Sequence, residues 1–241
     1  MSLKDYKITI IGDSIPKGLT IDDNLRINRL QVTAVKEIEQ HYNITINNMS
    51  VFGQTLQRIC NRNMIEEYLD TINPEEKNVL VLSIGGNDAD YDWVQVGLTP
   101  SLHHSSKTDY RDFKRYLSDT TKKLLAKNVK VIFVTLFPIH NERYFYNIIN
   151  KKANGKNVLK FLNNDLSNLS RHQELFNNAI IANALKYNCE IIDIRSIFLD
   201  AIDYLDYCSN DGIHPTNAGQ KCIADIVINH FDAKHSLAQQ F

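Results

Sequence analysis

The sequence is poor in the features that mark membrane-spanning and nucleic-acid-binding proteins. Its 241 residues contain no run of about 18 apolar residues, which is the length that a helix needs to cross a bilayer. The 27 basic and 28 acidic residues nearly cancel, and the basic residues form no tract. Binding to nucleic acid relies on such positive charge. We therefore expect neither insertion into a membrane nor a nucleic-acid partner.

Cysteine is also scarce. The four cysteines, Cys60, Cys189, Cys208 and Cys222, lie far apart and form no CxxC pair. A chain of this length needs no disulfide framework, so we expect reduced thiols and a cytoplasmic protein. No signal-peptide hydrophobic region precedes the first apolar segment. A leader removed earlier would leave the same sequence, so secretion stays open, and the sequence does not fix the oligomeric state.

Signature motifs of several enzyme classes are absent. The chain has no P-loop, no GxGxxG fingerprint and no GxSxG elbow, which argues against an NTPase, a Rossmann dehydrogenase and an elbow-type α/β-hydrolase. His103 and His104 are adjacent, but no HExxH motif or carboxylate at ligand spacing accompanies them. We expect a solvated loop there, no metal site and no cofactor.

Apolar, β-branched segments alternate along the chain with amphipathic ones. The apolar segments predict five strands, which begin with Ile8 to Ile11 and continue with Ile44–Met49, Val79–Ile84, Val129–Phe137 and Glu190–Ile194. Helical spacing predicts a first helix from about Leu25 to Tyr42 and a last one capped by Thr216 or Asn217. Such alternation, without repeats or linkers, indicates one domain over residues 1–241 with a doubly wound parallel sheet.

Polar residues follow several of these strands. Ser14 comes directly after the first strand, at the carboxyl edge where open α/β sheets bind their ligands. A serine nucleophile needs an imidazole to take its proton, and the imidazole needs a carboxylate to orient it. Asp211 and His214 are three residues apart before a helix cap, so one turn can bring them together. These three residues are the candidate catalytic set.

Two further segments offer hydrogen-bond donors for an oxyanion. Gly53 presents a backbone N–H that no side chain crowds, and Asn87 carries a side-chain amide. Deleting one such donor costs roughly 3–4 kcal/mol of transition-state stabilisation in comparable sites. Each of these residues taken alone is also explained as a turn or cap residue, and Asp88 is expected to stabilise its own turn.

Taken in order, these segments resemble the SGNH (GDSL-type) serine hydrolase family. The matching blocks are Gly12-Asp13-Ser14-Ile15 (with Ile15 for the usual leucine), Asn48 to Gly53, Gly85-Gly86-Asn87-Asp88 and Asp211-Gly212-Ile213-His214-Pro215. The resemblance implies that Ser14 is the nucleophile, His214 the general base and Asp211 the orienting acid. It also implies an oxyanion hole made of the Ser14 and Gly53 amides and the Asn87 side chain. Ser50 and Gln54 depart from the family pattern in the second block, which leaves the exact shape of that loop open.

Two connections are longer than most loops of α/β proteins. They span residues 89–107 and 139–164, and either could close the site. The candidates for contact with substrate are Asp13, Trp93, His140 and Tyr144. The aromatic residues of these loops, Tyr91, Trp93, Tyr144 and Tyr146, form either a platform for a sugar or acyl group or part of the core.

Our interpretation is a metal-independent serine esterase on a flavodoxin-like, three-layer α/β/α sandwich with a central, mostly parallel five-stranded sheet. It hydrolyses a carboxylic ester of a small molecule or glycan through an acyl-enzyme on Ser14. A short acyl group, such as acetyl on a carbohydrate, is favoured because no strongly apolar lid helix accompanies the site. The alternatives are a lysophospholipase or thioesterase of the same family, or a non-catalytic member that binds a glycan or acyl ligand.

Overall fold

A five-stranded sheet, in which every strand runs parallel to its neighbours, forms the centre of the molecule. The computed structural model describes residues 3–238. The strands are β1 (Tyr6–Gly12), β4 (Ile46–Asn48), β5 (Lys77–Ser83), β6 (Lys130–Val134) and β7 (Glu190–Ile192). They lie side by side in the order β4-β1-β5-β6-β7. Counted along the chain this is the flavodoxin order 2-1-3-4-5, so the predicted sandwich is confirmed.

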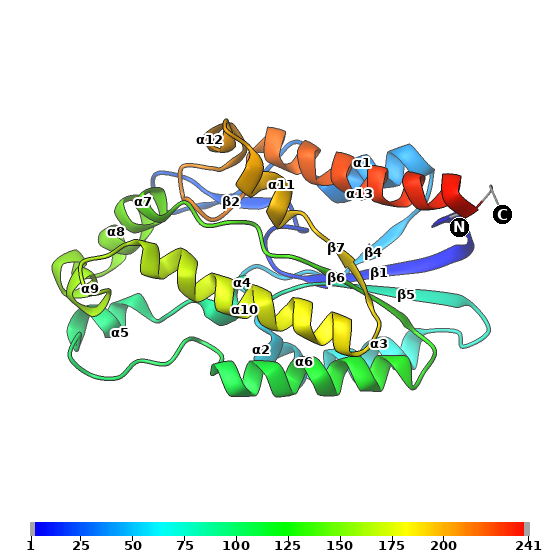
Figure 1. Ribbon diagram of the computed structural model, residues 1–241, viewed down its shortest axis with the longest axis horizontal. Coiled ribbons are helices and arrows are strands. Elements are labelled where there is room, and N and C mark those ends of the chain that lie inside the picture. The colour runs from blue at the N-terminus through cyan, green and yellow to red at the C-terminus, as the bar shows by residue number, and fades with distance from the viewer. Residues whose placement is uncertain (1–2, 239–241) are drawn as a thin grey trace.

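Helices cover both faces of this sheet (Figure 1). One face carries α1 (Ala34–Tyr42), α11 (Arg195–Asp200) and α13 (Asn217–Ala238), and the other carries α2 (Leu56–Asn61), α3 (Met64–Thr71), α6 (Tyr110–Leu125) and α10 (Ser167–Lys186). Side chains alternate along the strands, so Ile10 of β1 packs toward α1 and α13 while Ile11 packs toward the other layer. The apolar runs of the strands are thus explained by burial on two sides.

The first predicted helix is wrong in its amino-terminal half. Residues 19–29 form a hairpin of β2 (Leu19–Ile21) and β3 (Ile27–Arg29), and α1 begins only at Ala34, after the capping side chain of Thr33. Ile27 matches the helical spacing by chance, because 53% of it is exposed. The predicted start of the last helix is confirmed. Asn217 is its first residue, and Thr216 accepts a hydrogen bond from the Gly219 amide.

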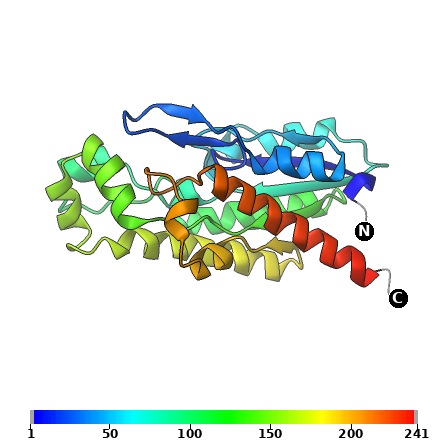
Figure 2. The ribbon, with the colours of Figure 1, turned by 90° about the horizontal axis from the view of Figure 1, so that it is seen from above.

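Both long connections fold into helices and pack against each other as a cap over one end of the sandwich (Figures 1 and 2). The cap comprises α5 (Trp93–Leu98), α7 (Asn141–Tyr144), the π-helix η2 (Phe145–Ile149), α8 (Asn150–Lys152) and α9 (Gly155–Phe161). It has its own apolar cluster, which includes Val96, Ile149 and Val158. The sequence predicts no strongly apolar lid helix, and the structure instead has several short helices from both connections that share this apolar cluster.

The remaining helices are short. They are η1 (Leu3–Asp5), α4 (Gly86–Ala89) and α12 (Tyr204–Tyr207). All four cysteines carry free thiols. Among the helices of residues 3–238, none is long and apolar enough to cross a membrane. That residues 1–241 form a single domain stays a prediction.

Candidate active site

Ser14 lies just beyond the carboxyl end of β1, at the point where the chain leaves the sheet. The sharp exit depends on Gly12, since a Cβ atom there would lie 2.6 Å from Pro16 Cγ and 2.9 Å from the Ser83 carbonyl oxygen. Ser14 is 95% buried in the wall of a cavity. Its position between the ends of β1 and β5 is the point where the strand order reverses, which is where this type of sheet binds ligands.

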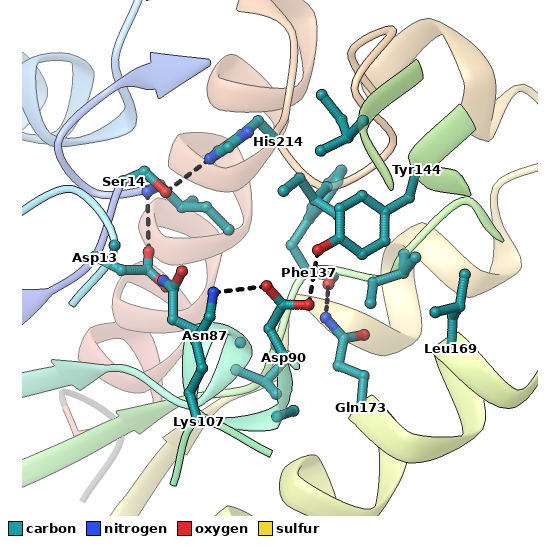
Figure 3. A pocket seen from close by; sticks show the side chains of 18 of the residues that line it. Asp13, Ser14, Asn87, Asp90, Lys107, Phe137, Tyr144, Leu169, Gln173 and His214 are labelled. Atoms are coloured by element: carbon teal, nitrogen blue, oxygen red, sulfur yellow. Dashed lines mark hydrogen bonds and ion pairs between the residues drawn. The ribbon is translucent and has the colours of Figure 1, made fainter. Parts of the chain in front are cut away.

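A chain of hydrogen bonds leads from Ser14 to a buried carboxylate (Figure 3 shows its first part). Ser14 Oγ lies 2.7 Å from His214 Nε2, and His214 Nδ1 lies 2.7 Å from Asp211 Oδ2. The other carboxylate oxygen accepts the backbone N–H groups of Ile213 and His214 at 3.0 and 2.9 Å. The turn from Asp211 to His214 therefore holds the imidazole between carboxylate and hydroxyl, the geometry in which it can accept a proton from the serine.

The β2–β3 hairpin supplies further donors to the same carboxylate. Thr20 Oγ1 and the Ile21 amide donate to Asp211 Oδ2 at 3.0 and 2.9 Å. Burial alone would raise the pKa of Asp211, but the hydrogen bonds from His214, Ile213 and Ile21 hold this pKa below its usual range. The carboxylate thus stays ionised beside the imidazole. Thr20 and Ile21 precede the predicted helix, and their spacing in the sequence carries no signal for this contact.

The three predicted oxyanion donors line one cavity. Gly53 adopts a φ of +68°, a conformation that favours glycine, and it faces the cavity together with Ser14 and Asn87. Asp88, the residue after Asn87, binds the start of α2, which directly follows the Gly53 loop. Its carboxylate accepts hydrogen bonds from the Leu56 amide at that helix start and from Thr108 Oγ1. These contacts are structural, as expected for Asp88, and they extend beyond its own turn to α2 and Thr108. Burial raises the pKa of Asp88 to about 6.

The cavity has a volume of about 210 Å³ and lies between the end of the sheet and the cap. Of the predicted contact residues, Asp13, Trp93 and Tyr144 line it. His140 does not, because its Nδ1 instead accepts the Arg143 amide at the start of α7. Both long connections contribute to the wall, so neither alone closes the site.

A sequence model of the GDSL-like lipase/acylhydrolase family matches residues 10–222. The chain belongs to this family. The match contains all four blocks on which the resemblance was based, and the structure brings at least one residue of each block to one cavity, among them Ser14, Gly53, Asn87 and His214. No curated protein matches the chain in sequence.

Solved structures that resemble this GDSL-family chain share little of its sequence. The lipase/acylhydrolase from Enterococcus faecalis has a TM-score of 0.65 at 14% identity, covering 95% of this chain and 96% of that one. A lipolytic G-D-S-L protein from Veillonella parvula gives 0.64 at 17% identity, with 94% and 98% covered. A psychrotrophic esterase from Pseudoalteromonas sp. gives 0.55 at 18%, with 96% and 99% covered. These likenesses show the fold alone.

Asp13 is the polar neighbour that the GDSL block places beside Ser14. Its Oδ1 accepts the Ile15 amide at 3.0 Å, and its Oδ2 accepts Asn87 Nδ2 at 3.3 Å. Burial raises the pKa of Asp13, although the nearby His214 and the hydrogen bonds pull it the other way. The carboxyl therefore orients the Asn87 side chain beside Ser14.

Asp90 is a cavity residue that the sequence did not reveal. Trp93 Nε1 and the Tyr144 hydroxyl each donate to its Oδ1 at 2.7 Å, and Lys107 Nζ lies 2.7 Å from its Oδ2 (Figure 3 shows the bonds to Tyr144 and Lys107). Trp93 and Tyr144 are thus both part of the cap's core and part of the cavity wall. Tyr146 is 57% exposed and does not line the cavity.

Metal-binding side chains do not gather in the part of the chain that the structure describes: residues 3–238 hold no group of three His, Cys, Asp or Glu placed to bind an ion. His104 Nε2 instead bonds to the Thr99 carbonyl. Independence of metal stays a prediction, which turnover in the presence of EDTA tests.

Proposed function

We propose that this GDSL-family protein is a serine esterase that hydrolyses carboxylic esters of short acyl groups. The observation that carries the proposal is the continuous hydrogen-bonded chain from Ser14 through His214 to Asp211, at the wall of a cavity that also holds the Gly53 and Asn87 donors. A protein that only binds a ligand has no need of such a chain. The non-catalytic alternative is disfavoured for that reason.

The mechanism follows from these positions. His214 Nε2 accepts the proton as Ser14 Oγ forms a bond to the ester carbonyl carbon. The oxyanion is bound by the amides of Ser14 and Gly53 and by the side chain of Asn87. When the bond to the alcohol breaks, His214 returns the proton to the leaving oxygen. Water then repeats both steps on the acyl-enzyme, which releases the acid and restores Ser14.

The size of the cavity supports a short acyl group. Its volume of about 210 Å³ lies below the roughly 300–1,000 Å³ that is typical of pockets for drug-sized ligands. An acetyl or butanoyl group fits such a space together with part of the alcohol, whereas a long acyl chain would extend outside it. The preference for a short acyl group therefore rests on the cavity volume and no longer on the expected absence of a lid helix. The same volume disfavours the lysophospholipase and thioesterase alternatives.

A panel of p-nitrophenyl esters, from acetate to dodecanoate, tests the proposal. We expect the highest kcat/KM at acetate to butanoate and a steep fall beyond hexanoate. A maximum at the long chains, or faster cleavage of a lysophospholipid or acyl thioester, would contradict the short-acyl assignment. Tight binding of esters without turnover would identify the non-catalytic alternative.

A further inference from the structure

The ion pair of Asp90 and Lys107 is a polar feature in a cavity whose other walls are largely apolar. Asp90 follows Asn87 by one short helical turn, and its amide bonds to the Asn87 carbonyl at 3.3 Å. In Figure 3 its carboxylate lies between Asn87 and Gln173. A few placed polar groups in an apolar pocket fix the orientation of a ligand. This pair is therefore placed to hold a part of the substrate close to the reacting carbonyl.

Both partners keep unused hydrogen-bonding capacity. A carboxylate has about four acceptor sites and an ammonium three donors. Asp90 uses three acceptor sites, on Trp93, Tyr144 and Lys107, while Lys107 places one donor on Asp90. Their side chains remain 19% and 42% exposed. One acceptor and two donors are thus left for a ligand.

The charges on the cavity wall favour neutral hydroxyl groups over anionic ligands such as phosphate or carboxylate. Lys107 is neutralised by Asp90, and Asp13 adds a second carboxyl on the same wall. A phosphate or carboxylate at this point would face both acids, and the other lysine that lines the cavity, Lys152, is exposed. A hydroxyl donates to a carboxylate and accepts from an ammonium at once. Neutral hydroxyl groups therefore match the pair best.

We propose that Asp90 and Lys107 form a subsite for the alcohol part of the ester, and that the substrate is an O-acylated polyol such as a sugar. Asp90 accepts a hydrogen bond from one hydroxyl group, and Lys107 donates to the same or the adjacent one. This inference rests on the proposed esterase activity. A purely structural role is the competing account. The Lys107 amide also donates to the Asp90 carbonyl at 2.7 Å, which joins the two ends of the 89–107 connection.

The test compares two acetyl esters that differ in the alcohol: p-nitrophenyl acetate, which has no free hydroxyl, and a mono-O-acetylated methyl glucoside. We expect Lys107→Met, which keeps the aliphatic stem and removes the donors, to lower kcat/KM for the sugar acetate about 10- to 100-fold more than for p-nitrophenyl acetate, the range for hydrogen bonds to charged groups. Lys127→Met, at an exposed lysine that does not line the cavity, is the matched control and is expected to leave the ratio of the two kcat/KM values unchanged.

Inhibition provides a second measurement. Methyl glucoside is expected to inhibit hydrolysis of p-nitrophenyl acetate competitively in the wild type, and at least tenfold more weakly in Lys107→Met, if one charge-assisted hydrogen bond is lost. Equal losses on both substrates, with unchanged inhibition, would assign the pair a structural role and overturn the subsite. Wild-type cleavage of p-nitrophenyl acetate without cleavage of the sugar acetate overturns it too. A wild type that cleaves neither ester contradicts the esterase itself.

Discussion

Asn87 has an observed structural contact and a proposed role as an oxyanion donor. Its side chain donates a hydrogen bond to Asp13 Oδ2 and lines the cavity beside Ser14, so it can serve the local structure, the oxyanion, or both. An oxyanion donor acts on the transition state, in which the carbonyl oxygen carries negative charge, more strongly than on the bound ester. A structural donor acts on the folded state whether or not substrate is present.

We expect Asn87→Ala to lower kcat roughly a hundred- to a thousandfold, the loss seen for one oxyanion donor in a comparable site, with little change in KM. Steady-state kinetics and the melting temperature of the same variant separate the two roles. A lower melting temperature with unchanged kcat would remove Asn87 from the mechanism.

Asp13 is a buried carboxyl beside Ser14, and burial raises its pKa. A raised pKa means that the ionised form costs folding free energy, and this cost grows as the pH rises through that pKa. We therefore expect Asp13→Asn, which removes the charge, to raise the melting temperature relative to the wild type more at pH 8 than at pH 4. Asp70→Asn, an exposed carboxylate on α3, serves as control. A difference in melting temperature that does not change with pH would show that Asp13 carries no destabilising charge at pH 8.

The candidate residues that belong to recognisable sequence blocks could be predicted, even though Ser14 and His214 lie 200 residues apart, and those outside the blocks could not. Ser14, Asn87 and the pair of Asp211 and His214 lie at strand ends or within one turn, where their spacing in sequence indicates their chemistry. Asp90 has no such signal, because its partner Lys107 is 17 residues away and joins it only when the loop folds back. The sequence indicates a role for this region only through the many polar residues in the long loop 89–107.

At the scale of secondary structure, the β2–β3 hairpin is the element that connects the first block to the last. Thr20 and Ile21 of β2 donate hydrogen bonds to the carboxylate of Asp211, which lies 191 and 190 residues further along the chain. Sequence periodicity favoured a helix there because Ile27 and Leu30 match its spacing, but this spacing carries no information about burial. The hairpin contacts the site through Thr20 and Ile21, and Ile21 and Leu25 also pack against the apolar cluster of the cap.

We expect Thr20→Val to reduce kcat about 3- to 30-fold, because one hydrogen bond to a charged acceptor is lost while the Ile21 amide remains. Thr20→Ser keeps the hydroxyl and is expected to restore most of the activity. KM should stay nearly constant in both variants, since Thr20 acts through Asp211. If the valine and serine variants lose activity equally, the threonine contributes by packing and not through its hydroxyl group.

At the scale of the whole molecule, the sheet explains why four distant blocks converge. Parallel strands end at the same edge, and the 2-1-3-4-5 order places β1 beside β5, so Ser14 and Asn87 meet at the point of reversal. The alternation of strands and helices in the sequence predicts this parallel sheet and its shared edge. It does not predict the cap, because the short cap helices pack on one another and not on the sheet, and their mixed polar composition is that of a loop.

The central claim is that Ser14 is a nucleophile activated by His214, and labelling with a fluorophosphonate tests it most directly. Phosphonates of this type form a covalent bond to a serine that an adjacent base has activated. Intact-mass and peptide analysis of the wild type is expected to show one adduct, on the peptide that contains Ser14. Ser14→Ala should take up no label and hydrolyse no ester while keeping the wild-type melting temperature. An adduct on another residue, or near wild-type turnover in Ser14→Ala, would contradict the account.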